Sequence, residues 1–233
     1  MSFHFRQFEV EDKQSTLRVG TDAMLLGAWA NPGNPRKILD IGTGCGVLAL
    51  MMAQKSDAMI DAIEIDPLSV NEARRNFASS PWPERIFAIH TSLQSFSNVA
   101  TSDYDFILTN PPFFSDSLKS PSVRKNITRH NESLTHMELV RIISYLLSQD
   151  GSFALILPAE TEDLFLRICQ ENRLNLLRRT MVFPKPNASP KRALLEFTRC
   201  RVTNVKVSEL TILDAAGNFT NEYLALTNGF HNF

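Results

Sequence analysis

Short apolar runs alternate along the chain with longer stretches in which apolar residues recur at helical spacing. This alternation is typical of βαβ units built around a parallel sheet. Strands are predicted at 37–41, 59–65, 85–90, 104–109, 152–157, 174–183 and 192–198. Helices are predicted at 47–54, 68–77, 134–147 and 160–172. We therefore expect an α/β fold with a doubly wound, seven-stranded, mostly parallel sheet, formed by one domain with residues 1–35 as an N-terminal cap and 36–233 as the core.

The composition is that of an ordinary soluble globular protein, with 43% hydrophobic and 21% charged residues. The three cysteines lie far apart and form no CxxC or Cys/His cluster, so neither a disulfide framework nor a metal site is indicated. No apolar run approaches the roughly 20 residues that span a bilayer, and the N-terminus lacks an apolar signal core. We expect a cytoplasmic, monomeric protein that binds no membrane and no metal.

Charge is distributed unevenly although the net charge is only −1. The stretch 119–206 holds 15 Lys and Arg against 8 Asp and Glu, and the rest of the chain holds 9 against 17. A basic half of this kind can bind phosphates, although a solvated surface gives the same imbalance. Within it, the polar segment 115–131 has no clear period, and we interpret it as a substrate-binding loop.

Glycines and acidic residues mark the ends of the first two predicted strands. Asp40-Ile41-Gly42-Thr43-Gly44-Cys45-Gly46 closes the first strand, and glycines let a backbone turn sharply and approach a ligand closely. Glu64 ends the second strand, 20 residues after Gly44, where a carboxylate can accept hydrogen bonds from both hydroxyls of a ribose. These features together predict a nucleoside-bearing cofactor across the carboxyl ends of the two strands.

The tetrapeptide Asn110-Pro111-Pro112-Phe113 directly follows the predicted strand 104–109. Proline fixes its own φ and has no N–H to donate, so the chain is held rigid and extended at the strand tip. The Asn110 amide oxygen and nearby carbonyls can accept hydrogen bonds from a planar –NH2 group, and Phe113 offers a flat face for stacking. This arrangement suits the exocyclic amine of adenine, although a plain Pro-Pro turn would have the same sequence.

The glycine pattern alone leaves two cofactors open, because residues 44–49 also satisfy the dinucleotide fingerprint G-x-G-x-x-[GA]. S-adenosylmethionine is favoured by Asp40, whose carboxylate could reach the amino group of the methionine part. It is also favoured by the tetrapeptide at Asn110, because a hydride-transfer enzyme has no need for an amine-holding clamp there.

The two motifs together resemble class I amino-methyltransferases, which have a Rossmann-like fold. Arg18-Val19-Gly20-Thr21-Asp22-Ala23-Met24-Leu25-Leu26-Gly27-Ala28-Trp29 is similar to the "KVGTDGVLLGAW" segment of the bacterial valine-tRNA adenine-N6 methyltransferases. Their "NPPFF" matches residues 110–114, and further matches lie at 129–132, 191–197 and 219–223. The resemblance implies S-adenosylmethionine as cofactor, tRNA as partner, and methylation of the adenine 3′ of the anticodon (position 37) in a valine tRNA.

The resemblance also implies residue roles. Catalysis is assigned to Asn110, Pro111, Pro112 and Phe113. Cofactor binding is assigned to Thr21, Asp40, Gly42, Gly44, Gly46, Glu64, Asp66, Ser92 and Asn110. Substrate binding is assigned to Phe113, Phe114, Lys125, Arg129, His130, Lys185, Lys191 and Arg192. Ser92 stands where related enzymes often carry an Asp, so contact with the cofactor's adenine would need Ser92 or a backbone group; Trp29 is interpreted as core packing.

Three alternatives stay open at this stage. The same clamp could hold a protein glutamine or another RNA or DNA adenine, and the basic stretch 119–206 argues against the glutamine. A nicotinamide-dependent oxidoreductase would use the overlapping fingerprint. A non-catalytic RNA-binding module would leave the tetrapeptide without a purpose.

Overall fold

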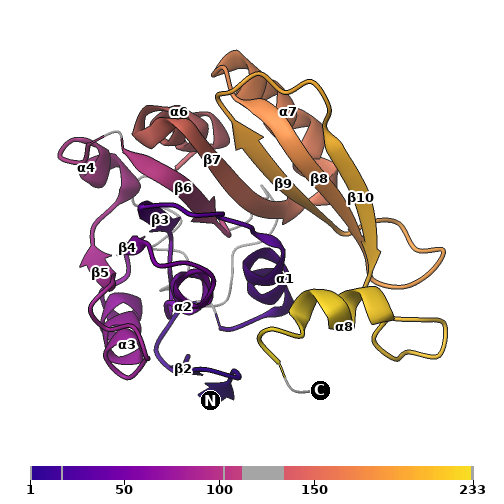
Figure 1. Cartoon of the computed structure of the whole chain (residues 1–233), viewed down its shortest axis with the longest axis horizontal. Coiled ribbons are helices and arrows are strands. Elements are labelled where there is room, and N and C mark those ends of the chain that lie inside the picture. Colours follow the sequence, from indigo (N-terminus) through magenta and orange to yellow (C-terminus); the bar gives the residue numbers. More distant parts are fainter. Residues whose placement is uncertain (1, 17, 102, 112–133, 232–233) are drawn as a thin grey trace.

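The computed structural model describes residues 2–16, 18–101, 103–111 and 134–231. Most of the strands lie in one sheet (Figure 1). The strands are β1 (Ser2–His4), β2 (Glu9–Glu11), β3 (Lys37–Ile41), β4 (Met59–Glu64), β5 (Ile86–His90), β6 (Tyr104–Thr109), β7 (Leu147–Pro158), β8 (Asn175–Phe183), β9 (Arg192–Thr198) and β10 (Lys206–Thr211). The helices are α1 (Thr21–Trp29), α2 (Val47–Lys55), α3 (Pro67–Ala78), α4 (Leu93–Ser97), α6 (His136–Leu146), α7 (Glu162–Glu171) and α8 (Asn221–Thr227), with a 3₁₀ turn at Ala159–Thr161.

Within the described residues, the large sheet has eight strands in the order β10-β8-β9-β7-β6-β3-β4-β5. Of these eight, β9 alone runs antiparallel to its neighbours, β7 and β8. The expected α/β architecture is confirmed, with one strand more than the seven expected. The additional strand, β10, pairs in parallel with β8 at the edge of the sheet. Its first four residues are exposed and mostly polar or charged, so it lacks the apolar run that marks the other strands.

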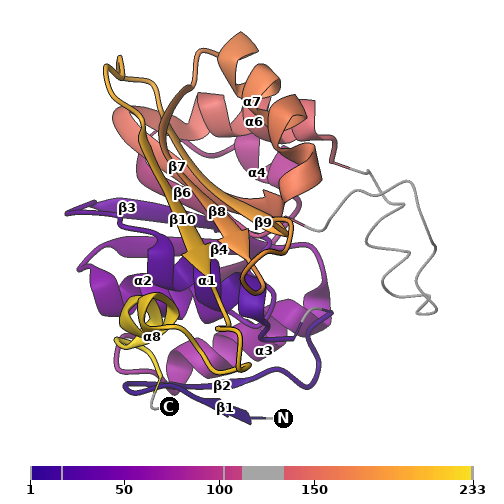
Figure 2. The same cartoon turned by 90° about the vertical axis from the view of Figure 1, so that its right-hand side faces the viewer.

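Helices cover both faces of the sheet (Figure 2). One buried cluster packs α1, α2, α3 and α8 against one face, and a second packs α4, α6 and α7 against the other. The predicted helices and strands between 37 and 109 agree with the structure to within a residue or two. The largest difference is β7, which begins at Leu147 rather than at residue 152, because Leu147 still pairs with Tyr104 across an irregularity in the ladder.

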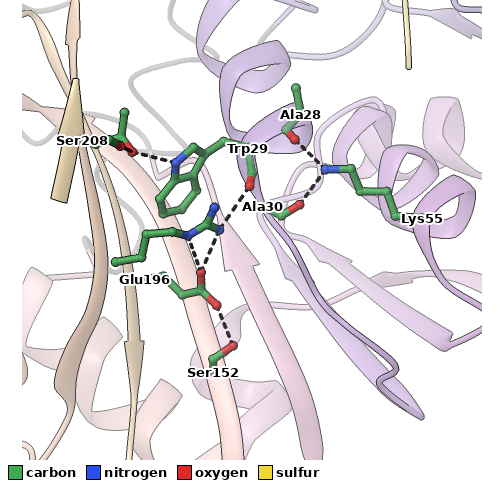
Figure 3. A network of polar contacts seen from close by, with 9 residues as sticks. Ala28, Trp29, Ala30, Lys55, Ser152, Glu196 and Ser208 are labelled. Carbon is green, nitrogen blue, oxygen red and sulfur yellow. Dashed lines mark hydrogen bonds and ion pairs between the residues drawn. The ribbon is translucent and has the colours of Figure 1, made fainter. Parts of the chain in front are cut away.

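A polar network fastens the end of α1 to the sheet (Figure 3). The Trp29 side chain is buried, as expected, and its indole N–H donates to the Thr180 hydroxyl at 2.8 Å. The Arg178 guanidinium stacks on the Trp29 ring at 3.6 Å and donates to Glu196 at 2.8 and 3.0 Å. Lys55 donates to the carbonyls of Ala28 and Ala30, both at 2.6 Å. Arg178 also donates to the Trp29 carbonyl at 3.1 Å. Lys55 and Arg178 thus provide hydrogen-bond donors for carbonyls at the end of α1 that have no partner within the helix.

The N-terminal hairpin β1–β2 lies beside the C-terminal helix α8 (Figure 2). Arg6 joins the two by donating to the His231 carbonyl at 3.0 Å and to the Asn228 side chain at 2.9 Å. Within the part of the chain that the structure describes, no helix is long and apolar enough to cross a membrane.

Replacing Arg178 with Met should lower the free energy of unfolding by about 3 kcal/mol, because it leaves the buried Glu196 carboxylate without its cation. The double variant Arg178→Met/Glu196→Leu should recover most of that loss, since neither charge is then buried. Urea denaturation at pH 7 measures both values. A loss below about 1 kcal/mol in the single variant would contradict the importance assigned to this pair.

Candidate active site

Three predicted site residues stand at the carboxyl ends of neighbouring parallel strands, Glu64 as the last residue of β4 and Gly42 and Asn110 just after β3 and β6. In the ladders, Ile41 of β3 pairs with Thr109 of β6 on one side and with Ile63 of β4 on the other. The next residues along these strands are Gly42, Asn110 and Glu64. They therefore lie side by side at the carboxyl ends of the strands, where open α/β sheets bind their ligands.

The glycine loop after β3 has a backbone that glycine alone adopts readily. Gly42, Gly44 and Gly46 have φ values of 72°, 56° and 90°. A Cβ atom on Gly46 would lie 2.3 Å from the Phe77 ring, whereas one on Gly42 would meet no atom within 4 Å. Gly46 is thus required for packing against α3, and Gly42 leaves open space beside the loop.

Glu64 is a buried carboxylate that joins the loop to the end of β4. It accepts hydrogen bonds from the Gly44 N–H at 3.0 Å through Oε2 and from the Asp66 N–H at 2.9 Å through Oε1. Burial raises the pKa of Glu64, while these two N–H groups oppose the rise. Each oxygen retains a lone pair, so the carboxylate could still accept hydrogen bonds from ligand hydroxyls.

Asp40 is fully buried beneath the same loop. Its Oδ2 accepts a hydrogen bond from the Thr43 hydroxyl at 2.6 Å, and Oδ1 has no hydrogen-bond partner within the described residues. Burial raises the pKa of Asp40 from 3.8 to about 7, against the opposing effect of the Thr43 hydroxyl. An unsatisfied buried carboxylate oxygen is costly, so this position favours a ligand that brings a donor or a positive charge.

The loop offers little to a pyrophosphate. The N–H groups of Gly42 and Thr43 donate to the Ile63 carbonyl, that of Gly44 to Glu64, and that of Gly46 to the Thr43 carbonyl. A dinucleotide would place its pyrophosphate at the start of α2, close to Asp40, whose ionised form the nearby Ala49 N–H favours without making a hydrogen bond of normal geometry. A second anion there would be repelled, so the arrangement favours a cationic ligand over a dinucleotide.

Asp66 and Ser92, expected to bind the cofactor, both cap helices. Asp66 accepts from the Ser69 N–H and hydroxyl at 2.8 and 2.7 Å at the start of α3. Ser92 accepts from the Ser95 N–H at 3.1 Å at the start of α4. Both lie just beyond the carboxyl ends of β4 and β5, so capping and a contact with a ligand are compatible. Thr21 is the first residue of α1 and is exposed.

Basic residues border the same edge of the sheet. Arg192 begins β9 opposite Pro158, the last residue of β7, and exposed Lys191 and Lys185 precede it in the loop after β8. The Arg192 guanidinium donates to both Asp22 oxygens at 3.0 and 2.9 Å, which ties β9 to the start of α1. The two lysines are therefore better placed for phosphates than Arg192, whose Nε is engaged in this ion pair.

Asn110 is half-buried and Pro111 is buried. Six further expected site residues lie outside the described residues, namely Pro112, Phe113, Phe114, Lys125, Arg129 and His130. The structure also contains a polar residue beside the glycine loop that the sequence did not reveal, Asn76 of α3, which contacts the Cys45 carbonyl at 2.8 Å. Its only signal in the sequence is the spacing of Ser69, Glu72 and Asn76, three and four residues apart, which puts three polar residues on one face of the predicted helix.

Comparison of the sequence with known proteins identifies the family to which this chain belongs. A family model described as the methyltransferase small domain matches residues 14–140. A relative from Parabacteroides distasonis is 39% identical over 229 residues, which cover 98% of this chain and 97% of that protein. A relative from Flavobacterium psychrophilum is 38% identical, with 98% of each chain covered. Both are named tRNA1(Val) (adenine(37)-N6)-methyltransferase.

The chain belongs to the tRNA1(Val) (adenine(37)-N6)-methyltransferase family. This confirms the resemblance inferred from the motifs at residues 18–29 and 110–114. Among solved structures, a predicted O-methyltransferase from Agrobacterium tumefaciens has a TM-score of 0.68 at 20% identity, covering 90% of this chain and 96% of that one. A SAM-dependent methyltransferase from Corynebacterium glutamicum has a TM-score of 0.52 at 18% identity, covering 79% and 90%. These two structures share the fold of this tRNA1(Val) (adenine(37)-N6)-methyltransferase family member.

Replacing Asp40 with Asn should stabilise the ligand-free protein at pH 8. The folded chain keeps the Asp40 proton up to about pH 7, whereas the unfolded chain releases it near pH 3.8, so the wild type loses stability as pH rises through this window. The advantage of the variant should grow from near zero at pH 4 to on the order of 4 kcal/mol above pH 7. Urea denaturation across this range measures it, and an advantage that does not change with pH would contradict the buried charge.

Proposed function

We propose that this protein uses S-adenosylmethionine to methylate the N6 amine of adenine 37, the base 3′ of the anticodon, in a valine tRNA. The observation that carries the proposal is the position of Asn110, which follows the strand next to Asp40 on the edge where Glu64 ends β4. The names of relatives that match almost the whole chain support the substrate. We further propose that it acts in the cytoplasm as a monomer.

The residues that fit the cofactor are those with unused hydrogen-bonding capacity. Glu64 would accept hydrogen bonds from the ribose hydroxyls, and the Oδ1 atom of Asp40 would accept one from the amino group. The open space beside Gly42 leaves room for close approach. When bound, S-adenosylmethionine supplies an electrophilic methyl group on a positively charged sulfur.

Asn110 and Pro111 would act on the adenine. The exocyclic nitrogen is a poor nucleophile, because its lone pair is delocalised into the ring. The Asn110 side-chain oxygen and the Pro111 carbonyl would accept its two N–H bonds, orient the nitrogen and stabilise the positive charge that develops on it. Phe113 would stack on the base. Methyl transfer would therefore depend more on the position of the adenine amine than on a strong base in the site.

The tRNA would bind at the carboxyl ends of the strands, where Asn110 and the proposed cofactor site lie. A base in an anticodon loop must be splayed out to enter a pocket. Exposed Lys185 and Lys191, beside the start of β9, would contact backbone phosphates. We assign the same role to Lys125 and Arg129, with His130 and Phe114 as further contacts with the RNA.

The function is tested by incubating the protein with methyl-labelled S-adenosylmethionine and an unmodified valine tRNA transcript, then digesting the RNA to nucleosides. We expect label in N6-methyladenosine, and none with a transcript that carries guanosine at position 37. Protein extract, DNA and NAD are tested in parallel. Label found only in protein, or binding of NAD without binding of S-adenosylmethionine, would refute the proposal.

The Asn110→Ala variant should lose at least about 100-fold in kcat but no more than about tenfold in affinity for S-adenosylmethionine, because the amine loses its acceptor while the cofactor loses only one of its assigned contacts. Single-turnover methylation and calorimetric titration measure the two quantities. An Asn110→Ala enzyme with wild-type kcat would rule out the amine-holding role.

The double variant Lys185→Ala/Lys191→Ala should raise KM for tRNA about tenfold, with kcat and cofactor affinity unchanged. The slope of log KM against log salt concentration should fall by about 1 for each phosphate that the variant no longer binds. Arg173→Ala, which removes an exposed charge at the opposite end of β8, is the matched control. Equal effects of the control and the double variant would mean that no specific phosphate contact is made at this edge.

A further inference from the structure

The segment 11–16, here called the N-terminal strap, is fastened along one face of α3. The Glu72 carboxylate accepts from the Gln14 N–H at 2.9 and 3.1 Å and from the Ser15 N–H at 2.7 Å. The Ser69 hydroxyl accepts from the Thr16 N–H at 3.2 Å. Ser69, Glu72 and Asn76 are spaced three and four residues apart, so they share one face of the helix.

Asn76 is the member of this face that also contacts the glycine loop. Its Nδ2 donates to the Cys45 carbonyl and to the Glu11 carbonyl, both at 2.8 Å, and its Oδ1 accepts from the Glu11 N–H at 3.0 Å. The side chain is only 4% exposed, and these bonds use both of its donor hydrogens. One amide therefore joins α3, the strap and the loop.

The Asn76–Cys45 contact lies where the chain turns from the glycine loop into α2. The Cys45 carbonyl belongs to the peptide that precedes Gly46, whose φ of 90° begins α2. The next residue of α3, Phe77, packs against Gly46 closely enough to exclude a Cβ atom. On the other side of Cys45, the Gly44 N–H binds Glu64. Asn76 and Phe77 thus restrain Cys45 and Gly46, which directly follow the residue whose N–H binds Glu64.

We propose that Asn76 is a positioning residue for the cofactor: it fixes the Cys45–Gly46 peptide, and through it the Gly44–Glu64 contact, without touching the ligand itself. This inference rests on the proposed use of S-adenosylmethionine. A glycine loop without this restraint would have to lose conformational entropy each time it binds the cofactor, which weakens binding. Loss of the Asn76 contact should therefore lower the affinity for the cofactor and leave the rate of methyl transfer unchanged.

The decisive variant is Asn76→Asp, which keeps the size and the Oδ1 acceptor but loses both donor hydrogens. It should raise the Kd and KM for S-adenosylmethionine at least about tenfold, with kcat at saturating cofactor within about twofold of wild type. Asn76→Ser retains one hydroxyl donor and should give an intermediate increase. This second variant keeps the test valid if a buried charge prevents Asn76→Asp from folding.

Two comparisons separate positioning from simple stabilisation. Asn71→Ala changes an exposed residue of the same helix and should leave Kd and kcat unchanged. Glu72→Ala removes the acceptor of the Gln14 and Ser15 N–H groups of the strap but keeps the Asn76–Cys45 bond, so it should lower the thermal midpoint while Kd changes less than about threefold.

Titration calorimetry with S-adenosylmethionine alone reads Kd without tRNA and without turnover. A wild-type protein that does not bind S-adenosylmethionine would overturn both this inference and the proposed function. Normal wild-type binding with an unchanged Kd in the folded Asn76 variants would overturn this inference alone. An equal loss of affinity in Glu72→Ala would overturn it too, because the strap rather than the loop contact would then determine affinity.

Discussion

Two buried carboxylates, Asp40 and Glu64, stand at the carboxyl ends of adjacent strands, and the surrounding structure is organised around them. Burying such groups is expensive unless donors compensate them. The donors are the Thr43 hydroxyl to Asp40 and the N–H groups of Gly44 and Asp66 to Glu64. The positive φ values of the loop glycines let the loop turn tightly enough for the Gly44 N–H to reach Glu64. One carboxylate oxygen of Asp40 is left without a partner among the described residues, which favours a ligand that brings a donor or a positive charge.

The same edge brings together two kinds of chemistry. The proposed acceptors of the adenine amine follow β6 at Asn110, and the exposed Lys185 and Lys191 that we assign to phosphates precede the start of β9. The carboxylates of Asp40 and Glu64 can coexist with the basic residues before β9 because two strands, β6 and β7, separate β3 from β9. At a spacing of about 4.8 Å per strand, the two regions lie on the order of 14 Å apart.

Local patterns in the sequence predicted most of the strands and helices between 37 and 109, and they placed Asp40, Glu64 and Asn110 at the ends of neighbouring strands. The strands from 37 to 109 are apolar runs bounded by glycine, proline or charged residues, and the glycine loop carries its own conformational requirement. Long-range contacts could not be predicted in this way. The Asp22–Arg192 ion pair joins residues 170 positions apart, and the Asn76–Cys45 contact depends on how α3 crosses the loop. The polar edge strand β10 is recognisable only from its pairing with β8.

The central claim is that the buried Asp40 carboxylate binds the positively charged amino group of the cofactor. It is tested most directly by counting the protons exchanged when S-adenosylmethionine binds, using titration calorimetry at pH 7 in buffers of different ionisation enthalpy. Because the pKa of Asp40 is raised to about 7, ionisation on binding should make the wild type release on the order of half a proton more than Asp40→Asn does. Equal proton release by the two proteins would contradict the claim.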